Sequence, residues 1–138
     1  MNDRNIYITQ RDLDRLDELI AVARRADTLD LEYLDRLEDA LLTKDGVDPR
    51  TVPPDVITMN SRARLADPLT GLAQEYTLVF PADADAAAGR ISVLAPLGTA
   101  MLGATVGQTV EWVSGGNTRK LLVDAILYQP EAAGDFHL

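Results

Sequence analysis

Apolar residues near the start of the chain recur every three to four positions, the spacing of one face of an α-helix. Thr9 and Asp12 just before this run resemble a capping box, in which side chains bind the free amides of a helix start. The pattern predicts an amphipathic helix over residues 10–26, whose apolar stripe consists of Leu13, Leu16, Ile20 and Ala23.

A second helical run carries Leu34, Leu37 and Leu41 on one stripe and ends near Lys44 and Gly46, a basic last turn and a glycine stop. Only residues 27–30 separate the two runs. Helices with so short a connection lie antiparallel, so we expect a helical hairpin that pairs its leucine stripes. At 1.5 Å per residue, each arm would be about 25 Å long.

The period changes to that of strands after residues 47–54, which contain three prolines. Residues 56–59 begin a β-prone run, and alternation over 62–65 and 75–80 around the turn 67–71 predicts an antiparallel hairpin. Further segments complete the prediction, namely strands at 91–94, 108–113 and 119–128, a helix at 97–103, a tight turn at 114–117 and a non-periodic tail at 129–138.

The chain therefore reads as α+β, with a helical hairpin over 1–48, a proline-rich linker over 49–54 and a domain over 55–138. That domain should contain about five antiparallel strands and one short helix. Its core is expected to contain Trp112, Tyr128 and Phe80 together with the leucines and valines around them. A compact domain with a projecting rod favours a binding module over an enzyme.

The amino-acid composition argues against several kinds of functional site. The 138 residues include no cysteine and one histidine, His137, which argues against disulfides, thiolate zinc sites and histidine-based catalysis. No metal, cofactor or catalytic residue is expected. Thirteen basic and 22 acidic residues give a net charge of −9, which would repel nucleic-acid phosphates, so contact with nucleic acid should be indirect.

Three acidic residues lie around the turn of the predicted helical hairpin: Asp27, Asp30 and Glu32. Carboxylates held at the tip of a rod could be delivered to a metal bound elsewhere. The simpler explanation is that acids at the start of the second helix complement its dipole. Both readings remain open at this stage.

Two other sets of residues have simple structural explanations. Gly115 and Gly116 fit a hairpin turn, because no Lys-Ser or Lys-Thr pair follows them to make a phosphate loop. Four bases of the second region, Arg62, Arg64, Arg119 and Lys120, fit a solvated strand face, with a partner-binding role as the alternative.

The N-terminal residues carry charge and lack an apolar stretch of signal-peptide length, and no run of about 18 apolar residues occurs. We therefore expect a cytoplasmic protein without membrane contact.

Residues 90–107, R-I-S-V-L-A-P-L-G-T-A-M-L-G-A-T-V-G, resemble the C-terminal domain of the Gre transcript-cleavage factors. D-V-I-T-M-N-S-R at 55–62 and Y-Q-P-E-A-A-G-D-F-H-L at 128–138 resemble a shortened branch of that family, the Rnk-type regulators of nucleoside diphosphate kinase. Over the helical region the resemblance is one of layout.

The resemblance implies an FKBP-like fold, a bent antiparallel sheet that wraps one helix, and docking on RNA polymerase at the rim of its secondary channel. The docking corner would comprise Leu94, Ala95, Pro96 and Leu97. Ala95 stands where the family has serine, and Leu94 replaces an acidic residue of some members, so the contact would be more apolar here.

Gre factors carry tip carboxylates to the polymerase magnesium, but arms of about 25 Å are too short for that reach. The resemblance thus implies a regulator that competes with Gre-type factors without stimulating cleavage and affects nucleoside diphosphate kinase levels indirectly. We expect a monomer, because a helical hairpin already buries its own apolar stripe. Two alternatives remain, a cleavage factor that uses Asp27 and Asp30, and a peptidyl-prolyl isomerase or chaperone of FKBP-like fold.

Overall fold

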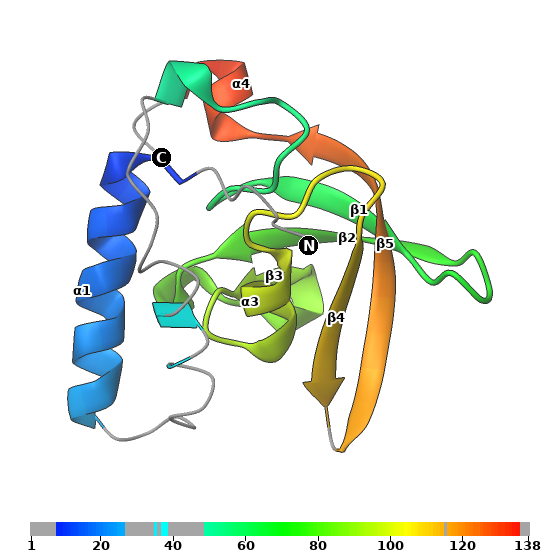
Figure 1. Ribbon diagram of the computed structural model, residues 1–138, viewed down its shortest axis with the longest axis horizontal. Coiled ribbons are helices and arrows are strands. Elements are labelled where there is room, and N and C mark those ends of the chain that lie inside the picture. The colour runs from blue at the N-terminus through cyan, green and yellow to red at the C-terminus, as the bar shows by residue number, and fades with distance from the viewer. Residues whose placement is uncertain (1–7, 27–34, 36, 39–48, 115, 136–138) are drawn as a thin grey trace, which may run out of the picture.

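The computed structural model describes residues 8–26, 35, 37–38, 49–114 and 116–135. One long helix is followed by a curled sheet and several short helices (Figure 1). The helical elements are α1 Gln10–Ala26, η1 Pro49–Thr51, η2 Pro81–Asp83, η3 Ala86–Ala88, α3 Pro96–Met101 and α4 Pro130–Ala133. The strands are β1 Arg62–Ala66, β2 Ala73–Val79, β3 Arg90–Ser92, β4 Thr109–Ser114 and β5 Asn117–Tyr128.

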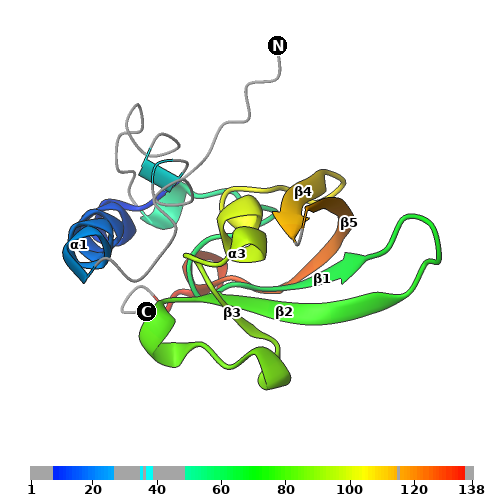
Figure 2. The ribbon, with the colours of Figure 1, turned by 90° about the horizontal axis from the view of Figure 1, so that it is seen from below.

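The five strands form one sheet in the order β3-β2-β1-β5-β4. Pairing is antiparallel between β1 and β2, between β1 and β5, and between β4 and β5. The sheet curls around α3, which packs against β4 and contacts β2 and β3 (Figures 1 and 2). An α+β chain whose bent sheet wraps one short helix is therefore confirmed.

One pairing differs from the prediction, because β3 runs parallel to β2 and the sheet is mixed. The chain reverses twice between these strands. After β2 it passes through η2, and a bridge between Asp85 and Arg90 then closes a second turn around η3. Two reversals restore the original direction, which a single hairpin turn cannot do.

Helix α1 has the predicted bounds and the predicted cap. The Thr9 hydroxyl oxygen accepts a hydrogen bond from the Asp12 amide at 3.1 Å, and the Leu13 amide donates to the Thr9 carbonyl at 2.9 Å. The start signal in the sequence therefore corresponds to a real helix start.

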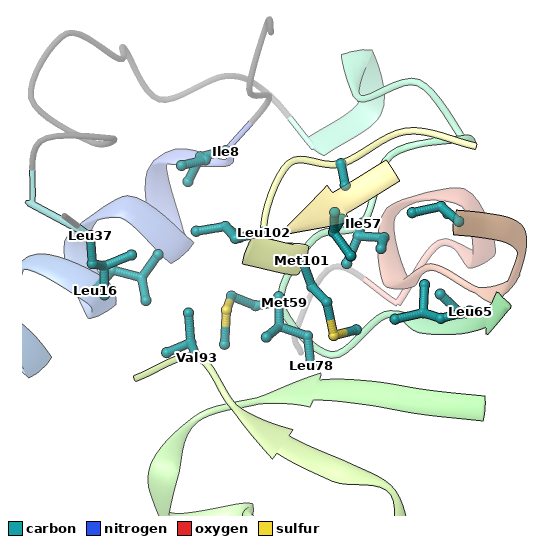
Figure 3. Packing of buried hydrophobic residues seen from close by; sticks show 14 of the residues in the cluster. Ile8, Leu16, Leu37, Ile57, Met59, Leu65, Leu78, Val93, Met101 and Leu102 are labelled. Atoms are coloured by element: carbon teal, nitrogen blue, oxygen red, sulfur yellow. The ribbon is translucent and has the colours of Figure 1, made fainter. Parts of the chain in front are cut away.

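The buried face of α1 belongs to the core of the sheet domain. Leu16 and Ile20 join one apolar cluster with Leu37, Met59 and Val93, which extends under α3 (Figure 3). The picture of a rod projecting free of its anchor is thus wrong for α1. An amphipathic stripe shows that a helix buries one face but does not show what covers it.

The second predicted arm lies mostly outside the described residues, as do the tip residues Asp27, Asp30 and Glu32. Its described members are helical and close to α1: Leu37 is buried, and Arg24 pairs with Asp35 at 2.7 Å and with Glu38 at 2.8 Å. The division into hairpin, linker and domain remains a prediction.

The core is aliphatic rather than aromatic. Its fully buried side chains are leucine, isoleucine, valine and methionine, whereas Phe80 and Trp112 are half-buried and pack on the edge of the cluster. Tyr128 is also half-buried, and its hydroxyl donates to Asp135 at 2.5 Å. Leucines and valines are buried in the core as expected, whereas the placement of Phe80, Trp112 and Tyr128 within it is wrong, since all three rings are half-buried.

Two further segments differ from the prediction. Residues 56–59 form no strand and make only one bridge, between Val56 and Thr105. The tail contains α4, which the Gln129 side chain caps by accepting from the Ala132 amide at 3.1 Å. The same side chain donates to the Pro53 and Val56 carbonyls at 2.8 Å, so it ties the tail to the segment before β1.

Candidate docking site

The four residues of the predicted docking corner, Leu94, Ala95, Pro96 and Leu97, lie between the end of β3 and the first turn of α3. Ser92, the last residue of β3, accepts two hydrogen bonds from the backbone of this corner. Its hydroxyl oxygen accepts from the Leu94 amide at 3.1 Å, and its carbonyl accepts from the Ala95 amide at 3.0 Å. The corner therefore has a defined backbone shape.

The start of α3 adds further restraints. Ala95 is the N-cap residue in extended conformation, with φ −76° and ψ 153°, and Pro96 fixes φ at the first helical position. The Thr99 amide donates to the Ala95 carbonyl at 2.9 Å, and its hydroxyl donates to the Val93 carbonyl at 2.7 Å. Ala95 supplies no capping oxygen of its own.

Gly98 lets the helix approach the strand more closely than any other residue would. A Cβ atom at this position would lie 1.9 Å from the Ser92 carbonyl oxygen and 2.8 Å from its carbonyl carbon. The obstacle is backbone, which cannot rotate away as a side chain can. Glycine is therefore required here for packing, while the left-handed conformation plays no part.

The corner presents a rigid surface without charged side chains. All four of its residues are half-buried, and Leu94 and Leu97 rest partly on the apolar cluster. A surface of this kind can bind an apolar partner with little loss of conformational freedom, because its backbone is already fixed. It offers no acid, base or nucleophile for catalysis.

A polar network lies between α1 and the sheet domain. Asp12, only 3% exposed, forms an ion pair with Arg15, and the Arg15 guanidinium lies 4.6 Å from the centroid of the Phe80 ring. Burial raises the pKa of Asp12, although the hydrogen bond and charge of Arg15 oppose that shift. The network fixes α1 beside the domain.

The Thr58 hydroxyl donates to Glu131 of α4 at 2.6 Å and lies 2.8 Å from the Ser61 hydroxyl. Burial raises the pKa of Glu131, and the negative charge of Asp12 adds to the rise, while the Thr58 hydrogen bond opposes it. The Thr58 hydrogen bond therefore ties α4 to the segment before β1.

The structure also shows where some of the basic residues and the turn glycines named in the sequence analysis lie. Arg64 pairs with Asp124 at 2.7 Å and Arg62 with Glu75 at 3.8 Å, as expected for a solvated strand face. Strands β4 and β5 pair up to Ser114 and Asn117, and Gly116 has φ +82°, as a tight hairpin turn requires.

No group of three or more His, Cys, Asp or Glu side chains in the described residues could hold a metal ion. None of the described helices is long and apolar enough to cross a membrane.

The sequence located the corner but missed the residues that shape it, Ser92 and Gly98. A glycine inside so short a helix was the available signal, because such a residue usually has a packing reason. The contact of Arg15 with Phe80 carries no local signal, since the two residues come from distant segments.

Comparison with known proteins agrees with this geometry. Residues 52–128 match the family model "Transcription elongation factor, GreA/GreB, C-term". The chain is 37% identical over 139 residues to the "Regulator of nucleoside diphosphate kinase" of Escherichia coli (strain K12), with 100% of both chains covered. It is also 37% identical over 90 residues to "Transcription elongation factor GreA" of Chlorobium phaeobacteroides, covering 64% of this chain and 57% of that protein.

A solved structure, "Prokaryotic transcription elongation factor GreA/GreB from Nitrosomonas europaea", superposes with a TM-score of 0.76 at 35% identity. The match covers 91% of this chain and 100% of the other. These relatives are named as a regulator and as transcription factors, in keeping with a chain that is not an enzyme. The full-length identity and the matched C-terminal domain show that the chain belongs to the GreA/GreB family of transcription factors.

Proposed function

We propose that this chain is a transcription regulator that binds RNA polymerase near its secondary channel through the corner Leu94–Leu97. The observation that carries the proposal is the rigid, uncharged and partly exposed form of this corner, at the position where Gre-type factors are expected to dock. A preformed apolar surface favours association because little ordering is required.

The chain then competes with Gre-type factors without stimulating transcript cleavage. Helix α1 has 17 residues, which corresponds to about 25 Å of helix. Its buried face is committed to the cluster that contains Val93, next to the corner. Both features support a helical region that stays near the channel entrance when the corner is docked.

The charge of the chain supports contact with polymerase rather than with nucleic acid. A net charge of −9 disfavours phosphate binding, so any effect on RNA or DNA would pass through the polymerase. We further propose that one chain binds per polymerase and that an influence on nucleoside diphosphate kinase is indirect, through transcription.

Direct binding of the full chain to purified RNA polymerase tests this function. Leu97→Asp places a charge on the apolar corner, and Ala95→Arg adds bulk and charge at a half-buried position, so each should weaken binding by about tenfold or more. Asp124→Asn, which removes an exposed ion pair on the sheet, is the matched control and should bind normally.

Circular dichroism of each variant separates a lost contact from a lost fold. Absence of binding by the unmodified chain would refute the proposal. Normal binding by both folded corner variants would show that the corner is not the surface that binds RNA polymerase.

A further inference from the structure

The turn between β1 and β2 carries the two most exposed large apolar side chains of the described residues. Leu69 is 94% exposed and Leu72 is 74% exposed. The turn extends from the body of the molecule on the side away from α1 in both views (Figures 1 and 2). Neither leucine belongs to the apolar cluster.

The turn has a fixed shape. The Asp67 carboxylate accepts from the Leu69 amide at 2.8 Å, and its carbonyl accepts from the Gly71 amide at 2.8 Å. The Asp67 amide donates to the Leu72 carbonyl at 2.8 Å, and the Leu72 amide donates to the Thr70 hydroxyl oxygen at 3.2 Å. The leucines are thus held outward by an ordered turn, and their exposure does not result from a loose loop.

Beside the turn lies a hollow of about 410 Å³, whose lining consists of Asp67, Pro68, Leu69, Trp112, Thr118, Arg119, Lys120 and Leu121. Trp112 and Arg119 are directly opposite each other on β4 and β5. The guanidinium carbon of Arg119 lies 5.9 Å from the centroid of the Trp112 ring. The hollow thus joins an aromatic wall, an apolar rim and two cationic groups, Arg119 and Lys120.

The charge of Arg119 is available for a ligand. Among the described residues, no ion pair involves Arg119, whereas Arg62, Arg64 and Arg90 each pair with an acid. The Asp67 carboxylate also lines the hollow, and its Oδ1 accepts from the Leu69 and Thr70 amides of the turn. Lys120 lines the hollow as well, so two cations and one carboxylate surround it.

We propose that Leu69, Leu72, Trp112 and Arg119, termed the hairpin-tip surface, bind an acidic peptide segment of a partner protein that carries one large apolar side chain. The apolar side chain enters the hollow against Trp112 and Leu69, and a carboxylate of the segment pairs with Arg119. The volume accommodates one or two side chains, which fits a short segment better than a folded domain. A hollow lined by two cations and one carboxylate favours an anionic segment through charge complementarity.

Trp112 is the only tryptophan of the chain, so its fluorescence reports directly on this surface. The probe is a short synthetic peptide of Glu and Asp residues around one central leucine, titrated into the full-length protein. A saturable blue shift of the Trp112 emission that weakens with added salt is expected. Two peptides serve as controls, one with serine in place of the leucine and one with lysines in place of the acids.

Leu69→Asp and Arg119→Glu should each weaken the binding by about tenfold or more, since one removes the apolar contact and the other reverses the charge. The first change is at a 94% exposed position, so the fold should survive it. Val22→Asp, at a 46% exposed position of α1, is the control and should bind like the unmodified chain.

The proposal is overturned if no peptide shifts the emission, or if the lysine or serine peptide shifts it equally. Sedimentation of the unliganded chain across concentrations tests a second copy as the occupant. Self-association that Leu69→Asp abolishes would assign the hairpin-tip surface to a second copy and overturn the peptide proposal.

Discussion

Replacement of Gly98 by alanine tests the geometry of the docking corner, because two physical effects oppose each other at this position. Gly98 lies inside α3, where alanine is favoured over glycine by about 1 kcal/mol. The added methyl group, however, would lie 1.9 Å from the Ser92 carbonyl oxygen. Helix propensity alone therefore predicts a more stable protein, and the close approach predicts a less stable one.

The size of the clash decides whether Gly98→Ala stabilises or destabilises the protein. Contacts shorter than 3.0 Å are essentially never seen for Cβ atoms, so strand and helix must separate by about 1 Å. Overpacking of a rigid region costs about 1–3 kcal/mol, and a backbone obstacle belongs at the upper end of that range. After the propensity gain is subtracted, Gly98→Ala should lower the free energy of unfolding by about 2 kcal/mol.

Urea unfolding followed by Trp112 fluorescence measures this change. Ala100→Gly, two positions along the same helix, shows the direction of the propensity effect and should cost at least about 1 kcal/mol, because the Ala100 methyl group also packs against the apolar cluster. A Gly98→Ala variant as stable as the parent, or more stable, would show that the close packing of strand against helix does not exist.

Other predictions concern the helix that packs on the domain and the ends of the short helices. Leu16→Ala should lower the free energy of unfolding by about 2–5 kcal/mol, whereas Val22→Ala on the exposed side should change it by less than about 0.5 kcal/mol. Equal small effects in urea unfolding would mean that α1 is not part of the core. Because burial raises the pKa of Glu131, its contribution to stability is present in acid and is lost as the pH rises from the ordinary value of 4.5 through the raised folded pKa. Glu131→Gln, which can still accept the Thr58 hydrogen bond, should remove this decline, and an unchanged pH profile of the unfolding free energy would contradict it. Ala95→Ser supplies the missing cap of α3 and should raise the melting temperature, with a gain of about 1 kcal/mol, while no gain would mean that the hydroxyl does not reach the free amides.

Local patterns predicted most elements well because their signals are contained in neighbouring residues. The bounds of α1, the two β-hairpins and the proline that begins α3 follow from periodicity, caps and turn residues. Helix α4 was missed because its cap is a glutamine, whose long side chain is not among the usual capping residues.

Contacts between distant segments could not be predicted in this way. The stripe of α1 predicted a buried face, but its partner could have been either the second arm or the sheet domain. The parallel direction of β3 depends on how η2 and η3 fold the connection. The corner was located by resemblance, yet its rigidity comes from Gly98 and Ser92, whose contact is visible only in three dimensions.

A transcript-cleavage assay on a stalled elongation complex tests the central claim most directly. The purified chain is added alone and in increasing amounts against a fixed concentration of a Gre factor. The account predicts no cleavage by the chain alone and a progressive loss of Gre-stimulated cleavage, which the folded Leu97→Asp variant fails to cause. Cleavage by the chain alone, or Gre-stimulated cleavage that stays unchanged at saturating amounts of the chain, would contradict it.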